Sequence, residues 1–282
     1  MLNCSKSNKY TDRCVATSCD ANYFPALMAL LRSLESTNPR LPVVVFDGGL
    51  TPRQASRARR YAEVLPKKPF MEIESRGKFA YIGQTTLLKF EVEHLDYEKV
   101  LYLDADTVVL EDLDEVFSIP DGCVGVVREV NSLRNMFRIQ HRDMLAENID
   151  IDWEAPGFNA GIFLLCPSQW RGLTRNAEQL VARFGKDVFT KSKDQQLLNI
   201  LFRGRLHDLP KKYNFAPFYD ETGESSPAVV HYLTFCKPWH SGYPPGHRYP
   251  EFRRHVRIAD HPEILLHDIK RCAKRFRRLH EA

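Results

Sequence analysis

The chain has 282 residues, enough for one large domain or two small ones, and its 43% hydrophobic and 27% charged residues are ordinary for a globular protein. A net charge of +4 is too small to indicate strong non-specific binding of nucleic acid, so no nucleic-acid partner is expected. The seven cysteines form no C-x-x-C pair, which indicates neither a zinc site nor a disulfide scaffold and fits a reducing compartment.

The first ten residues, MLNCSKSNKY, contain no apolar signal region, and no run of the chain approaches the length of a membrane span. The sequence therefore predicts a cytoplasmic protein, with peripheral attachment to the inner face of a membrane as an open alternative. No internal repeat, low-complexity segment or clear linker is visible. We expect one main domain over residues 1–243 and a C-terminal extension over residues 244–282.

The N-terminal part of the chain alternates apolar strand-like runs with helical patterns, which is typical of an α/β fold. Pro25 stands in the first turn of one expected helix, and Thr51 with Pro52 begins the next as a cap followed by proline. We expect strands at residues 14–19, 41–46 and 70–73, and helices at residues 25–34, 51–65 and 85–95.

The most informative stretch is VLYLDADTVVL, residues 100–110, in which an apolar strand ends at Asp104 and Asp106. Near-continuous apolar runs are typical of buried strands, and ligands of open α/β sheets bind beyond the carboxyl ends of the strands. Two carboxylates there repel each other unless a cation lies between them, and Mg²⁺ or Mn²⁺ takes oxygen ligands and is shared with phosphates. We interpret the pair as a D-x-D site that holds a divalent ion against a diphosphate. A capped strand-to-turn junction is the alternative.

Two further residues of this half point toward the same ligand. Asp20 follows the first strand directly, and strand, acidic turn and helix form the opening of a nucleotide-binding unit. Its carboxylate can accept hydrogen bonds from a base or ribose, or it can cap the following helix, and the spacing does not separate the two roles. Lys89 lies on the helix before the D-x-D strand, so it can approach the same ligand.

The second half of the chain continues the alternation of strands and helices. Its polar residues 131–152 form a candidate acceptor loop or lid around one expected helix. We expect strands at residues 123–127, 158–165 and 228–233, short strand-like pieces at residues 206–209 and 213–216, and helices at residues 136–145, 174–184 and 194–202.

Small and polar residues stand at the ends of these elements. Ala160 and Gly161 permit close approach of a ligand, and Asn159 can bond a sugar hydroxyl, although a β-bulge with glycine explains the same pattern. Asp194 either caps its helix or aims a carboxylate into the cleft. His231 lies near a strand terminus, where it is either structural or a third ligand of the metal site.

Residues 262–282 are expected to form a basic amphipathic helix. Leu265, Ile269 and Leu279 share an apolar stripe, and six Lys and Arg side chains lie between residues 270 and 278. Such a helix can bind an anionic membrane surface, or it can dock on its own domain with a solvated basic face. Both interpretations stay open.

Six motifs follow one another along the chain: VATSCDANY, LLKF, YLDADTVV, FNAGIFLL, KDQQLLN and HYLTFCKPW. In this order they resemble the glycosyltransferases of family 8, the group that includes glycogenin and bacterial lipopolysaccharide galactosyl- and glucosyltransferases, over most of residues 15–239. The resemblance implies a GT-A (Rossmann-like) catalytic domain with a mixed, mostly parallel sheet flanked by helices. It also implies metal-dependent, retaining transfer of a hexose from a UDP-sugar to a glycan, lipid-linked or lipopolysaccharide acceptor.

The resemblance assigns roles to individual residues. The ligands of Mn²⁺ or Mg²⁺ would be Asp104, Asp106 and His231. The nucleoside pocket would be formed by Ala16, Asp20 and Tyr23. The other contacts to the nucleotide sugar would come from Lys89, Asp104, Ala105, Asn159, Ala160 and Gly161. The catalytic group would be Asp194, Gln195 and the diphosphate-binding Lys237.

One position departs from the family pattern, because Thr234 stands where the last motif usually has glycine between its histidine and its lysine. A Cβ there would crowd the diphosphate or alter loop closure, so the role of Lys237 is less secure than that of His231. Gln195 is a poor nucleophile and better suits stabilising an oxocarbenium-like centre during attack on the same face. Asp194 is the candidate nucleophile if a covalent intermediate forms.

Other functions fit the residues less well. A nucleotidyltransferase usually carries a glycine-rich phosphate loop after its first strand, and this chain has SCDANY there. Loss of a metal ligand would favour a catalytically weak nucleotide-sugar-binding module, yet all three candidate ligands are present. A protein acceptor in place of a glycan stays open. A membrane- or nucleic-acid-binding protein that acts through its basic tail is the last alternative. The tail is too small a part of the chain to be the whole function.

Overall fold

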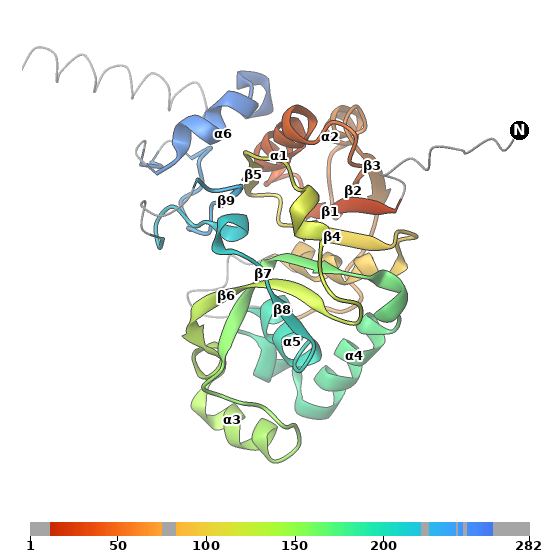
Figure 1. The fold of residues 1–282 in the computed structure, drawn as a ribbon, viewed down its shortest axis with the longest axis vertical. Helices are drawn as coiled ribbons and strands as arrows, with labels where there is room; N and C mark the ends of the chain where they lie inside the picture. Colours follow the sequence, from red (N-terminus) through yellow and green to blue (C-terminus); the bar gives the residue numbers. More distant parts are fainter. Residues whose placement is uncertain (1–11, 75–82, 221–225, 241, 245–246, 262–282) are drawn as a thin grey trace, which may run out of the picture.

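The computed structural model describes residues 12–74, 83–220, 226–240, 242–244 and 247–261. A seven-stranded sheet with the order β3-β2-β1-β4-β7-β6-β8 runs through the centre of the molecule (Figure 1). Its strands are β1 (Arg13–Cys19), β2 (Val43–Asp47), β3 (Glu63–Pro66), β4 (Lys99–Leu103), β6 (Val124–Ser132), β7 (Pro156–Leu165) and β8 (Leu206–Asp208).

The sheet is mixed and mostly parallel, which confirms the predicted fold class. Strand β1 pairs in parallel with β2 and with β4, β2 pairs in parallel with β3, and β6 with β8. Only β7 runs antiparallel to its two neighbours, β4 and β6, among the strands of this sheet that the structure describes. Because β1 and β4 point the same way, the residues that follow them, Asp20 and Asp104, emerge at one edge of the sheet.

Helices cover both faces of the sheet (Figure 1). On one face lie α1 (Phe24–Thr37) and α2 (Pro52–Ala58), and on the other lie α4 (Leu173–Phe184), α5 (Lys193–Leu201) and the 3-10 helix η2 (Gln84–His94). Successive strand residues point to opposite faces, so Val15 packs with α1 while its neighbour Ala16 packs in the cluster of η2 and α5. The remaining helical elements are α3 (Ile139–Ala146), α6 (Tyr249–His255), η3 (Asp114–Phe117), η4 (Leu133–Met136), η5 (Pro167–Gln169), η6 (Lys186–Phe189), η7 (Lys211–Asn214) and η8 (Ile258–Asp260).

A second, two-stranded sheet determines the position of the D-x-D motif. Strand β5 (Thr107–Val109) pairs antiparallel with β9 (Val229–His231), with Thr107 opposite His231. The chain passes from β4 to β5 through residues 104–106, so the motif is the connection between the two sheets. This pairing places His231 beside two aspartates that precede it by more than a hundred residues.

The structure corrects the sequence prediction in the segment after β2. The helix predicted at residues 51–65 begins as expected, with a capping box of Thr51 and Gln54, but it ends at Ala58. Residues 63–66 form β3, and the strand predicted at residues 70–73 is wrong, because those residues are irregular. Val64 is buried and pairs with Val45, so burial in a parallel pair outweighs local helix propensity.

Two further elements differ from their predicted form. The helix predicted at residues 85–95 is the 3-10 helix η2, whose residues Leu87, Leu88 and Phe90 are all fully buried. The strand-like piece predicted at residues 213–216 is the end of η7, and only Phe215 forms a bridge, to Val230. The remaining predicted strands and helices of the described residues are present with shifted ends.

The described part of the C-terminal extension packs on the main body. Helix α6 lies beside α1 (Figure 1), and its Tyr249 and Phe252 share a buried cluster with Val108 and Val230 of the small sheet. The Asp260 carboxylate at the end of η8 is paired with the guanidinium groups of both Arg32 and Arg57. The predicted basic helix over residues 262–282 lies outside the described residues, and the division at residue 243 stays a prediction.

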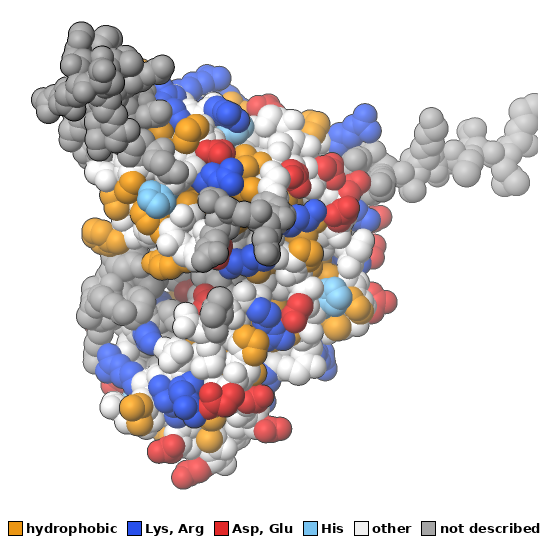
Figure 2. Space-filling model, turned by 60° about the vertical axis from the view of Figure 1, so that its left-hand side comes forward, with side chains coloured by type: hydrophobic (Ala, Val, Ile, Leu, Met, Phe, Trp, Pro, Cys, Tyr) orange, Lys and Arg blue, Asp and Glu red, His pale blue; other side chains and the backbone are white. Residues whose placement is uncertain are grey.

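The surface carries charges of both signs. Figure 2 shows Lys and Arg side chains interspersed with Asp and Glu side chains on the described part of the visible face. Among the helices that the structure describes, none combines the length and the apolar character needed to cross a membrane.

Candidate functional site

A cavity of about 660 Å³ opens at the sheet edge where β1 and β4 end. Its walls come from the β1–α1 turn, the D-x-D loop, β6, β7, the first turn of α5 and the segment after β9. The lining includes most of the residues that the sequence singled out, namely Asp20, Tyr23, Asp104, Ala105, Asp106, Asn159, Gly161, Asp194, Gln195, His231 and Lys237. The fold therefore collects residues from both halves of the chain around one hollow.

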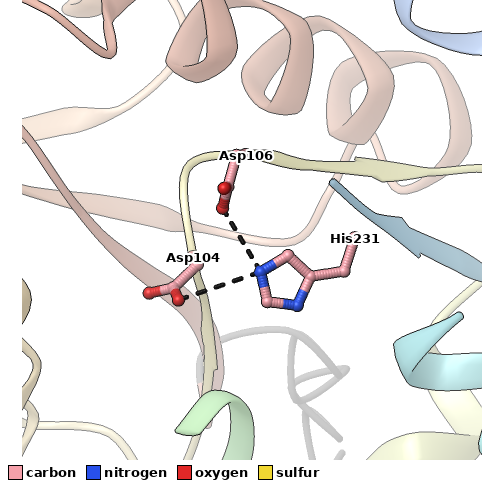
Figure 3. Close-up of side chains that lie close together, drawn as sticks. All are labelled: Asp104, Asp106 and His231. Atoms are coloured by element: carbon pink, nitrogen blue, oxygen red, sulfur yellow. Dashed lines mark ion pairs between the residues drawn. The ribbon is translucent and has the colours of Figure 1, made fainter. Parts of the chain in front are cut away.

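Asp104, Asp106 and His231 form a compact cluster in this cavity. Each offers one atom suited to bind a metal, and these atoms lie within 4.8 Å of one another. Nε2 of His231 is 3.3 Å from Oδ1 of Asp106 and 3.9 Å from Oδ2 of Asp104. In Figure 3 both aspartates extend from the loop after β4, and the ring of His231 points one nitrogen at both carboxylates. Two carboxylate oxygens and an imidazole nitrogen form a set of ligands that suits a divalent metal ion.

Gly161 keeps space open beside this cluster. A Cβ at this position would collide with Cε1 of His231 and lie 2.7 Å from Oδ2 of Asp104 and 2.9 Å from Oδ1 of Asn159. The Gly161 carbonyl also accepts the Asp104 N–H at 2.7 Å, so the backbones of β7 and the D-x-D loop are in direct contact. Glycine at this position therefore lets the His231 ring and the Asp104 carboxylate lie directly against β7.

Lys237 lies against the same cluster. Its Nζ is 2.6 Å from Oδ2 of Asp106 and 2.7 Å from the carbonyl oxygen of Tyr232. Burial by itself raises the pKa of Asp106, but the Lys237 ammonium and His231 outweigh burial and hold that pKa below its usual range. Asp106 is therefore ionised, as a metal ligand must be. The Thr234 hydroxyl donates to the Cys236 carbonyl at 2.7 Å, so it is used inside the turn that precedes the lysine.

Lys89 lies beneath the cavity floor and is almost fully buried. Its Nζ is 2.6 Å from Oδ2 of Asp194, 3.2 Å from Oδ1 of Asp104 and 3.0 Å from the Ala160 carbonyl. Burial lowers the pKa of this lysine, but the two aspartates more than offset burial and raise it. Burial and the nearby Asp104 carboxylate raise the pKa of Asp194, although Lys89 opposes them. The lysine thus joins η2, β7, α5 and the D-x-D loop, and neither it nor Ala160 lines the cavity.

Gln195 lies between β7 and β6 at another part of the cavity. Its Oε1 accepts hydrogen bonds from Nδ2 of Asn159 at 3.2 Å and from the Ala160 N–H at 3.4 Å. Its Nε2 donates to Oε1 of Glu129 at 3.3 Å. Burial raises the pKa of Glu129, although hydrogen bonds from Gln195 and Asn159 oppose that shift. The sequence analysis missed Glu129, and the signal that could have found it is an acidic residue that follows an apolar strand toward the same sheet edge.

The expected nucleoside side of the cavity is only partly as predicted. Asp20 lines the cavity, and its Oδ1 accepts the N–H groups of Asn22 at 2.9 Å and Tyr23 at 3.2 Å in the turn before α1, so it holds this turn and does not cap the helix. The structure does not bring Ala16 to the cavity, because its side chain is fully buried between β1 and η2. Ser18, two residues further along the same face of β1, lines the cavity instead.

Comparison with a family model and with individual proteins gives glycosyltransferases in each case. A family model described as glycosyl transferase family 8 matches residues 14–242. The glycosyltransferase GlyE of Streptococcus pneumoniae serotype 4 is 22% identical over 251 residues, which cover 81% of this chain and 57% of GlyE. The lipopolysaccharide 1,2-glucosyltransferase of Escherichia coli (strain K12) is 24% identical over 268 residues, which cover 83% of this chain and 75% of the relative.

Solved structures with a similar fold include the galactosyltransferase LgtC. A complex of LgtC with donor and acceptor sugar analogs superposes with a TM-score of 0.67 at 23% identity, covering 86% of this chain and 95% of LgtC. An active-site mutant of LgtC superposes with a TM-score of 0.69 at 21% identity and the same coverage. These likenesses establish the shared GT-A fold.

Proposed function

The chain belongs to glycosyltransferase family 8, and from that premise we propose that it transfers a hexose from a UDP-sugar to a hydroxyl group of a glycan or glycolipid acceptor, with retention and with a divalent ion. One observation carries this proposal: Asp104, Asp106 and His231 lie within 4.8 Å of one another in the cavity at the sheet edge, and Lys237 contacts one of them. A divalent ion among these residues would neutralise the charge that develops on the leaving nucleoside diphosphate.

The residues around the cluster support a division of work. Asp104, Asp106 and His231 would hold Mn²⁺ or Mg²⁺, and Lys237 would add a second positive charge for the diphosphate. Lys237 now bonds Oδ2 of Asp106, so it is already oriented toward the place where the phosphates would lie. A lysine buried in this way needs little reorganisation to stabilise charge, which is how such groups lower a barrier.

Retention is supported by the state of the two candidate residues of α5. The Asp194 carboxylate is held by Lys89 at 2.6 Å, and an ion-paired, buried carboxylate is a poor attacking group. Gln195 has a neutral amide with both ends hydrogen-bonded. Attack by the acceptor on the face that the diphosphate leaves fits this arrangement better than a covalent intermediate on Asp194. A leaving phosphate oxygen would take the acceptor proton.

The acceptor would enter beside the polar wall of the cavity that lies on β6, η4 and the start of α5. This wall carries hydroxyl-binding side chains, namely Glu129, Asn131, Asn135, Lys191 and Ser192. The asparagine amides can both donate hydrogen bonds to sugar hydroxyls and accept them, and the Glu129 carboxylate can accept them, as binding of a glycan requires. The relatives named above include a lipopolysaccharide glucosyltransferase, which favours a lipid-linked or lipopolysaccharide acceptor.

A protein acceptor and a catalytically weak nucleotide-sugar-binding module are the alternatives to this proposal. A screen of UDP-sugars for slow hydrolysis without acceptor separates the binding module from the enzyme, and transfer assays that compare glycan with protein acceptors test the other alternative. With Mn²⁺, one or a few UDP-sugars should be hydrolysed, and EDTA should stop the reaction. If no UDP-sugar is hydrolysed or transferred in the presence of Mn²⁺ although UDP binds, the binding-module alternative replaces the enzyme.

The predicted cytoplasmic location stays a proposal, and membrane contact is a proposal that rests on the basic helix predicted for residues 262–282. Co-sedimentation with anionic vesicles tests the contact by comparing the full chain with a chain that ends at Asp260. Binding by the full chain alone at low salt supports it, because salt screens such attraction. Equal co-sedimentation of the two chains would contradict membrane contact through residues 262–282.

A further inference from the structure

The two ring nitrogens of His231 face different surroundings. The side chain is 1% exposed, and its Nε2 points at the carboxylates of Asp104 and Asp106. Its Nδ1 lies 3.0 Å from Oδ1 of Asn214, which is itself 3% exposed. Asn214 stands in the segment KKYN and has no assigned role in the proposed site. Its contact is directed at the one ring atom that the cluster does not use.

Main-chain hydrogen bonds hold Asn214 in this place. The next residue, Phe215, donates its N–H to the Val229 carbonyl at 3.0 Å and accepts the His231 N–H at 2.8 Å. Phe215 therefore bridges to β9 as a short parallel partner of Val230. Since Asn214 precedes that bridge directly and His231 takes part in it, their side chains meet as a consequence of backbone pairing. The contact is a fixed part of the fold.

The chemistry of this contact specifies one form of the imidazole. An amide Oδ1 is an acceptor only, so the ring nitrogen that faces it must carry a proton. A neutral imidazole has one proton, so Nδ1–H leaves the lone pair of Nε2 for a divalent ion that would lie between this nitrogen and the two carboxylates. The opposite tautomer would place a proton on Nε2 and could not bind a metal there. Metal-bound histidines commonly donate their other N–H to such a partner, which also fixes the ring plane.

We infer that Asn214 is a positioning residue for the metal site, which holds His231 as the Nδ1-protonated tautomer with Nε2 presented to a divalent cation. This inference rests on the metal binding in the proposed function. Loss of such an outer partner typically weakens metal affinity by about 10–100-fold. Asn214 would therefore be required for affinity although it touches neither metal nor substrate.

The test measures Mn²⁺ binding by the full-length protein, from the EPR signal of free Mn²⁺, in four chains. Asn214→Leu fills the space without an acceptor, and Asn214→Asp keeps an acceptor for the Nδ1 proton. Asn38→Leu is the matched control, because Asn38 is also a buried amide that accepts an N–H, from Leu113 at 2.9 Å, but it does not line the cavity. We expect Asn214→Leu to weaken binding by about 10–100-fold, Asn214→Asp to stay within about threefold of wild type, and Asn38→Leu to bind as wild type does.

A second measurement separates this inference from the function on which it rests. Long-range ¹⁵N–¹H NMR of the protein loaded with diamagnetic Zn²⁺ reports on the Nδ1–H of His231, which should exchange slowly with water in wild type and faster in Asn214→Leu. Equal exchange of this proton in the two chains, or wild-type Mn²⁺ affinity in a folded Asn214→Leu protein, overturns the inference alone. A wild-type protein that binds no Mn²⁺ removes the proposed metal site and the inference with it.

Discussion

The two ends of the cavity are built from different chemistry. At the ion end, defined by Asp104, Asp106, His231 and Lys237, opposite charges meet at distances down to 2.6 Å. At the amide end, defined by Glu129, Asn159 and Gln195, hydrogen bonds to the Gln195 amide span 3.2–3.4 Å. A leaving diphosphate needs concentrated positive charge, whereas sugar hydroxyls need neutral donors and acceptors. The contrast therefore indicates which end would receive which part of a nucleotide sugar.

The two ends also come from different parts of the fold. The ion end lies where the loop after β4 meets β9 of the small sheet, and the amide end lies on β6, β7 and α5. Strand β7 links them, because Asn159 belongs to one end and Gly161, two residues later, borders the other. If this division is correct, substitutions at the ion end should affect metal and diphosphate, and those at the amide end should affect the sugar.

The largest effect is expected at Asp106. Asp106→Asn removes a charged ligand and the partner of Lys237. Turnover of the UDP-sugar should fall more than about 100-fold, which corresponds to a loss of about 3 kcal/mol or more of transition-state stabilisation. Steady-state rates at saturating Mn²⁺ measure this. Asp112→Asn, in the exposed loop before η3, is the control and should keep wild-type turnover. Near-normal turnover in Asp106→Asn would mean that the ion end is not the reaction centre.

The next effect is expected at Lys237. Lys237→Met keeps a long, unbranched side chain but removes the ammonium group that lies 2.6 Å from Oδ2 of Asp106. Turnover should fall by about 100-fold, because the developing charge on the diphosphate loses a donor, while the acceptor KM changes little. Lys212→Met is the matched control, since Lys212 pairs with the exposed Glu115 away from the cavity. An increase in acceptor KM with unchanged kcat would place Lys237 at the acceptor instead.

Gly161→Ala tests the border between the two ends. Its Cβ would collide with the His231 ring and crowd Asp104, and overpacking of this kind costs about 1–3 kcal/mol. We expect a lower free energy of unfolding in urea and weaker Mn²⁺ binding together. Gly242→Ala is the control, because among the described residues a Cβ there meets only the Cys236 sulfur, at an ordinary 3.7 Å. Unchanged Mn²⁺ affinity in Gly161→Ala would show that the positions of His231 and Asp104 against β7 do not matter for the cation.

The smallest effect is expected at Glu129. Glu129→Met removes the acceptor for the Gln195 amide, whereas Glu129→Gln retains one, so only the methionine variant should lose activity, by about 1 kcal/mol or roughly fivefold. Affinity for UDP itself should stay the same in both, because the nucleotide does not need the amide end. Calorimetry of UDP binding and rates with the intact donor measure the two quantities. Equal loss in both variants would assign Glu129 a role that depends on its charge.

The ion end could be predicted from the sequence because its chemistry is local or part of an ordered motif. Asp104 and Asp106 stand one residue apart after an apolar strand, and His231 and Lys237 share the motif HYLTFCKPW. All four line the cavity. Asn214 could not be predicted in this way. Its partner His231 becomes a neighbour only through the pairing of Phe215 with β9, which no local pattern reports.

The errors in the fold have a related cause. The helix predicted over residues 51–65 is too long. The residues before position 63 are good helix formers, but residues 63–66 pair with the distant strand β2, which a local pattern does not report. Ala16 was correctly placed in a strand, but the alternation of a strand does not say which face meets the ligand. Ser18 lines the cavity and Ala16 does not, and the packing of η2 decides this.

The central claim is that the ion end binds a nucleoside diphosphate through a divalent cation. Calorimetric titration of the full-length protein with UDP, in Mn²⁺ and in EDTA, tests it most directly. The account predicts that UDP binds at least about tenfold more tightly with Mn²⁺, and that Asp106→Asn removes this difference. Equal affinity for UDP in Mn²⁺ and in EDTA, or a Mn²⁺ dependence that survives in Asp106→Asn, would contradict it.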